Sequence, residues 1–131
     1  MIGGIRYFCY VGGIGPMAGS GRIVTCVFAT LRTESAEHAL RWLVHQVDHV
    51  ADRLDPGPVP GLECVPAPEA DGPALMRAWH TDPANRRHAW NRLVNEGRGV
   101  SLIFPDGLDH YRFGISPEWK PARARLPRPP L

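Results

Sequence analysis

The chain has 131 residues, 44% of them hydrophobic and 21% charged, with a formal net charge of +2, which suits one globular domain. No apolar run approaches the ~18 residues of a membrane span, and the three cysteines lack CxxC spacing. These features argue against a membrane protein and against a disulfide scaffold. We therefore expect a cytoplasmic protein with no membrane partner.

The N-terminal part predicts two strands. Residues 5–11 and 22–32 are rich in β-branched and aromatic side chains, and glycines bound each segment. The glycine-rich stretch between them, residues 12–21, predicts a flexible hairpin loop. It lacks the lysine of a phosphate-binding P-loop, and no helix follows it, so a phosphate cradle is disfavoured.

Residues 33–54 predict one amphipathic helix, which Thr33 or Ser35 could cap. Its apolar side chains recur at intervals of three and four and form a narrow stripe that must pack on a sheet or a helix. The members of the stripe are Leu40, Leu43, Val44, Val47, Val50, Ala51 and Leu54. The segment 55–61 ends the helix, and residues 62–65 could form a short strand.

The opposite side of this helix has an unusual composition. It carries His38, Trp42, His45, His49 and Asp52, within about 80° of arc. A tryptophan beside three histidines favours a covered surface, so we predict an interface made of His38, Trp42, His45 and His49, formed within the chain or with a second copy. The spacing of His45 and His49 also allows a metal site with Asp52 or His38 as third ligand, but we assign no metal.

Two further helices are predicted at residues 74–80 and 84–97. Asp82 as N-cap, Pro83 at the first helical position and Gly97 as C-cap fit the rules for the ends of the second one. Its inward face should consist of Ala89, Trp90, Leu93 and Val94.

A β-hairpin is predicted from residues 100–104 and 111–115, which alternate around "PDGLDH". Pairing Phe104 with Tyr111 aligns the two apolar faces, whereas a tight turn on residues 105–107 would put them out of step, so the register stays open. The proline-rich residues 119–131 predict a flexible tail.

The order of these elements, ββα(β)ααββ, defines the fold class. We predict an α+β domain spanning residues 1–118, with an antiparallel sheet of about four or five strands and the helices packed on one face.

Residues 73–115 follow the order of a winged helix-turn-helix. Ten basic and six acidic residues give positions 71–131 a net charge of +4, which favours an anionic partner. Arginine and asparagine are the side chains that read base edges and phosphates. The predicted nucleic-acid-binding residues are Arg86, Arg87, His88, Asn91, Arg92, Asn95 and Arg112.

No catalytic or cofactor motif is present, so we assign no catalytic residue and no cofactor. We expect a small non-enzymatic binding or regulatory protein, with nucleic acid as the specific partner. Two alternatives remain open: a protein-interaction module that forms a homodimer through the helix at 33–54, and a small histidine- or metal-dependent enzyme with His45 as base.

Overall fold

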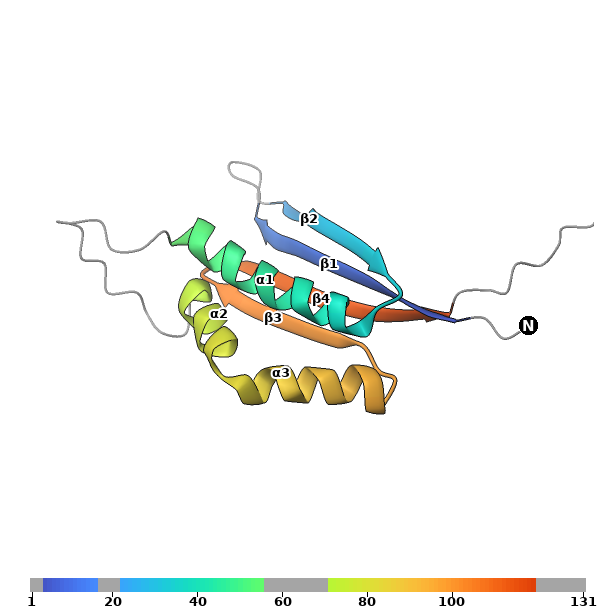
Figure 1. The fold of residues 1–131 in the computed structure, drawn as a ribbon. Coiled ribbons are helices and arrows are strands. Elements are labelled where there is room, and N and C mark those ends of the chain that lie inside the picture. The colour runs from blue at the N-terminus through green and yellow to red at the C-terminus, as the bar shows by residue number, and fades with distance from the viewer. Residues whose placement is uncertain (1–3, 17–21, 56–70, 120–131) are drawn as a thin grey trace, which may run out of the picture.

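The computed structural model describes residues 4–16, 22–55 and 71–119 and confirms the α+β fold class. Strands β1 (Ile5–Pro16), β2 (Ile23–Thr33), β3 (Val100–Asp106) and β4 (Asp109–Trp119) form an antiparallel sheet in the order β2-β1-β4-β3. Helices α1 (Ala36–Leu54) and α2 (Gly72–Thr81) pack on one face of this sheet, and α3 (Pro83–Trp90) packs against α1 and α2 on the same side, next to the edge strand β3 (Figure 1). The possible strand at 62–65 lies outside the described residues.

Strand β1 is longer than its apolar core predicted. The strand continues through Gly12, Gly13 and Gly15 to Pro16, paired with β2 throughout and with β4 as far as Ile14. We predicted a loop from residue 12 onward, so the predicted loop begins too early. The glycines fit the ladder because neighbours occupy the space of their side chains. A Cβ at Gly13 would lie 2.9 Å from the ring of Phe28, and a Cβ at Gly15 would overlap Asp109.

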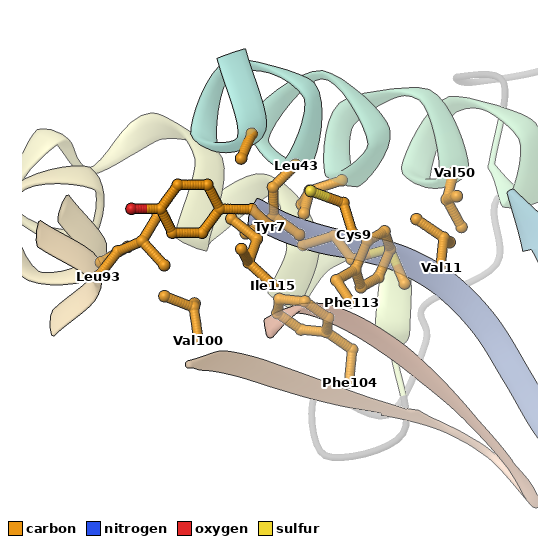
Figure 2. Packing of buried hydrophobic residues seen from close by; sticks show 14 of the residues in the cluster. Tyr7, Cys9, Val11, Leu43, Val50, Leu93, Val100, Phe104, Phe113 and Ile115 are labelled. Atoms are coloured by element: carbon orange, nitrogen blue, oxygen red, sulfur yellow. The ribbon is translucent and has the colours of Figure 1, made fainter. Parts of the chain in front are cut away.

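Helix α1 begins at Ser35, whose hydroxyl accepts a hydrogen bond from the His38 amide at 3.1 Å. Its buried residues meet the apolar side chains of β1, β4 and β3 in one core (Figure 2). From α1 these are Ala39, Leu43, Val47, Val50 and Ala51. Leu54 was expected in this stripe but lies in the last turn of α1 and is 38% exposed.

Helix α3 is capped by Asp82, which accepts a hydrogen bond from the Ala84 amide, with Pro83 at the first turn as predicted. It continues as a π-helical turn, η2 (Asn91–Asn95), before Gly97 at φ +64°. The wider turn rotates the later side chains around the axis.

Two of the four residues that we predicted for the inward face of this helix are buried and two are not. Ala89 and Leu93 are buried, as expected, but Trp90 is 38% exposed and Val94 is 43% exposed. The prediction that these last two residues belong to the inward face was therefore wrong.

The β3–β4 hairpin has the register that aligns its apolar faces. Phe104 pairs with Tyr111, and the turn lies at Gly107, with φ +62°, and Leu108. Strand β4 continues to Trp119, paired with Ile5, so the first residue of the predicted tail belongs to the sheet. The rest of that tail, residues 120–131, lies outside the described residues.

Candidate functional site

The face of the sheet opposite the helices has no covering element among the described residues (Figure 1). In β1, Tyr7, Cys9 and Val11 point into the core, so Arg6, Phe8 and Tyr10 point to the other face. We call this helix-free surface the open face. Its side chains come from alternate positions of all four strands.

An aromatic pair lies on β1, one of the two inner strands of the sheet. The ring centroids of Phe8 and Tyr10 are 6.0 Å apart, with 27° between the ring planes. Tyr10 reaches over β4 to Gly114, where a Cβ would overlap its ring. Because Gly114 has no side chain, the tyrosine ring can lie against the neighbouring strand and turn a π-face outward.

Arginine extends this pair across the sheet. Arg32 on β2 is paired directly with Phe8, and its guanidinium lies 4.5 Å from the ring centroid, a cation–π contact. Glu118 on β4 holds two guanidinium groups, with its carboxylate 3.3 Å from Nε of Arg6 and 3.8 Å from Nε of Arg32. The result is a row of stacked planar groups with a charged end.

The charge of the open face is positive. Its strand positions hold three arginines (Arg6, Arg32 and Arg112) and one carboxylate (Glu118), a net charge of +2 with His110 neutral. All three arginines lie beside or near the aromatic pair, on β1, β2 and β4. Such a surface can attract a polyanion and offer planar groups to its bases.

Of the residues predicted to bind nucleic acid, only Arg112 lies on the open face. The others lie in the helical layer on the opposite side of the sheet: Arg86, Arg87, His88, Asn91, Arg92 and Asn95. Arg112 therefore lies on the opposite side of the sheet from the six other residues that we predicted to bind nucleic acid. The hairpin that would form the wing of a winged helix-turn-helix is part of the four-stranded sheet, because β4 lies between β1 and β3.

Several helical candidates have local hydrogen-bond partners. Arg92 donates from Nε to the Gly99 carbonyl at 3.1 Å, which braces the chain after η2. Arg86 donates to the His80 carbonyl at 3.0 Å, and Asn95 donates to Asn91 at 2.7 Å. These side chains therefore have hydrogen-bond partners within the fold, although all of them except the half-buried Arg92 are exposed, as are Arg87 and His88.

The histidine stripe of α1 is more open than we expected. Trp42 packs against the core and is partly buried, but His38, His45 and His49 are exposed in the single chain. The rings of His45 and His49 are parallel within 10°, with centroids 6.1 Å apart. Neither expected third ligand joins them, because His38 contacts Thr33 and Asp52 pairs with Arg77.

The described part of the chain therefore brings His45 and His49 together without a third ligand. Among the residues that the structure describes, no group of three or more His, Cys, Asp or Glu could hold a metal ion. In the same part of the chain, no helix is long and apolar enough to cross a membrane.

Comparison with known proteins gives no relative from which a function could be transferred. No family model matches the chain, and neither the curated proteins nor the solved structures contain a match. The function must therefore be argued from the geometry of this chain.

The sequence contained a signal for the open face that our prediction did not use. Arg6, Phe8 and Tyr10 alternate with Tyr7, Cys9 and Val11 in a strand that we had correctly placed. Both sets contain aromatic side chains, so alternation alone could not show which set the helices cover.

Proposed function

We propose that this protein binds single-stranded nucleic acid on the open face of its sheet. The observation that supports this most directly is the row formed by Tyr10, Phe8 and Arg32, since bases stack on aromatic rings and on guanidinium planes. A sheet face with this arrangement suits unpaired bases, because bases inside a duplex do not present their planes.

Positive charge supports the same partner. Arg32 and Arg112 lie on β2 and β4, on either side of the aromatic pair of β1, so a strand crossing the sheet could place phosphates against both. Each neutralised phosphate releases counterions, which makes binding to a single strand weaker as salt rises. The open face thus offers both a stacking contribution and an electrostatic one.

The helical surface around α3 is the alternative location for a nucleic acid, as the sequence suggested. It has positive charge, but its predicted contact residues include no Phe, Tyr or Trp, and the imidazole of His88 is their one aromatic ring. Arg92 and Arg86 also donate to backbone carbonyls of the fold. The open face is the better candidate for these reasons, and the two surfaces can be tested separately.

The test compares two charge-matched double variants. Fluorescence anisotropy with a labelled 12-nucleotide single strand should show about tenfold weaker binding for Arg32→Gln/Arg112→Gln, with the slope of log K against log salt reduced by about 1.4. Arg86→Gln/Arg87→Gln removes the same charge from α3 and should bind within about twofold of the unaltered protein. The opposite pattern would move the interface to α3, and no binding at low salt would refute nucleic-acid binding itself.

A second comparison isolates stacking from charge. Tyr10→Leu keeps an apolar side chain over Gly114 but removes the π-face, and it should weaken single-strand binding about tenfold. The same variant should leave the salt dependence unchanged, because no phosphate contact is lost. Unaltered affinity in Tyr10→Leu would show that bases do not stack on this face.

A further inference from the structure

A groove separates the C-terminal half of α1 from the edge strand β2, on the helix-covered side of the sheet and away from the open face. Its volume is about 790 Å³, within the range of small-molecule sites. The described residues that line it are Val27, Phe28, Ala29, His45, Gln46, His49, Val50, Arg53, Leu54 and Tyr111.

One wall of the groove carries two imidazoles and a guanidinium group. His45, His49 and Arg53 follow one another at intervals of four residues along α1, so they form a single row of donors. No Asp or Glu occurs among the described lining residues. Asp52, the nearest acidic residue in sequence to Arg53, pairs instead with Arg77 at 3.4 Å.

The facing wall is aromatic. The ring of Phe28 lies over Gly13 and 6.3 Å from the ring of Tyr111, centroid to centroid. Phe28 is 54% exposed although it is large and apolar, so part of its ring is free for contact. Burial, with a smaller effect of Asp109 and Asp106, raises the pKa of Tyr111, so its hydroxyl keeps its proton and can donate a hydrogen bond.

The aromatic wall is a product of an irregular β1–β2 pairing. The register shifts between Val11 and Gly12, where Ala29 and Val27 pair with consecutive residues of β1 and Phe28 is left over. This bulge turns Phe28 toward the helix side, where Gly13 leaves room for it. A second hollow of about 370 Å³ shares Phe28 and Tyr111 with the groove and extends toward Gly15. Asp109 lines this second hollow, so the acidic group of a ligand should lie in the first groove and not here.

From these walls we infer that the groove binds a small aromatic anion, an aromatic carboxylate or phosphate. The acidic group would receive hydrogen bonds from the row of His45, His49 and Arg53. The ring would lie against Phe28 and Tyr111. Charge complementarity selects an anion, and the exposed aromatic wall selects a flat apolar body.

The experiment uses two probes of the same shape on the full chain. Titration calorimetry should show saturable, sub-millimolar binding of 1-naphthoate. The neutral analogue 1-naphthalenemethanol should bind at least fivefold more weakly. Equal affinity for the two probes would overturn the inference, because the cationic wall would then contribute nothing, and so would the absence of naphthoate binding.

Variants place the probe in the groove. His49→Gln/Arg53→Gln should weaken naphthoate binding about tenfold and leave the neutral probe unchanged. His38→Gln/Arg41→Gln removes the same two residue types from the other end of α1, outside the groove, and should bind naphthoate normally. An equal loss in both variants would show a nonspecific response to the charge of the helix.

A third variant tests the aromatic wall. Phe28→Ala should weaken both probes, and circular dichroism should show an intact fold because Phe28 is more than half exposed. Retained binding of both probes would place them elsewhere on the protein. Arg32→Gln/Arg112→Gln on the open face should keep full naphthoate binding, so this inference and the proposed function can fail independently.

Discussion

The two faces of the sheet are built from the same four strands but differ in how deeply their large side chains are buried. On the helix-covered face, Phe113 is fully buried and meets Phe104 edge-on, with ring centroids 5.6 Å apart. On the open face, Phe8 is only partly buried and lies between Tyr10 and the guanidinium of Arg32. An aromatic residue contributes mainly to folding on the first face and remains available to a partner on the second.

Charge follows the same division. No charged or polar residue is buried in the described part of the chain, so the covered face is an apolar core. The open face holds Arg6, Arg32, Arg112 and Glu118, which are solvated and, in part, paired with one another. Ion pairs of this kind add little to stability.

The comparison can be tested most strongly with one phenylalanine from each face. Phe113→Ala should lower the free energy of unfolding by about 3–5 kcal/mol, because it opens a cavity in the core. Phe8→Ala should cost about 1–2 kcal/mol, from lost ring and cation–π contacts. Urea denaturation measures both, and equal losses would show that the open face is also covered in the folded protein.

The buried thiol of Cys9 should make the free energy of unfolding depend on pH in the alkaline range. Burial raises the pKa of Cys9 from 9.0 to about 11, so the folded state favours the neutral thiol. The resulting stability is complete below pH 9 and is lost as the pH rises from 9 to 11, by about 2–3 kcal/mol. Unfolding measured across this range should show that loss.

Two controls identify Cys9 as the cause. Cys9→Ala should remove this part of the alkaline loss and leave the contribution of Tyr111, whose pKa is raised in the same direction. Cys26 is exposed and should react with iodoacetamide in the folded protein, whereas Cys9 should react only on unfolding. Rapid alkylation of Cys9 in the native state would contradict its burial.

The fold could be predicted from local patterns to a large extent. Alternation identified the strands, and Asp82 marked a helix start. The sequence left the cap of α1 open between Thr33 and Ser35 and left the register of the β3–β4 hairpin open, and the structure shows Ser35 and the Phe104–Tyr111 pair. The errors came from long-range effects. The glycines of β1 extend a strand because Phe28 and Asp109 fill their space, and no local signal shows this.

The candidate site was harder to predict for a related reason. The position of β4 between β1 and β3 decides that Arg112 joins Phe8 and Tyr10 rather than the arginines of α3. Strand order depends on pairing between segments about a hundred residues apart. A reading of consecutive elements therefore grouped Arg112 with its neighbours in sequence instead of its neighbours in space.

The smallest expected effect on stability concerns Glu118, the one carboxylate at the strand positions of the open face. Glu118→Gln should change the free energy of unfolding by less than about 1 kcal/mol, since its side chain and those of Arg6 and Arg32 are 32–57% exposed. The same substitution should have a clearer effect on the affinity for single-stranded nucleic acid than on stability. Removing the carboxylate frees both guanidinium groups and raises the net charge of the face from +2 to +3.

Binding of a single strand should therefore become about two- to fivefold tighter in Glu118→Gln, most clearly at low salt. Glu37→Gln is the matched control, because it breaks the 2.6 Å pair with Arg41 on α1 and leaves the open face unaltered. Fluorescence anisotropy titrations of both variants with the labelled single strand measure this change in affinity. Weaker binding in Glu118→Gln would mean that the carboxylate holds Arg6 and Arg32 in the geometry that the strand requires. A stability loss above 2 kcal/mol would instead make the open face part of the folding core.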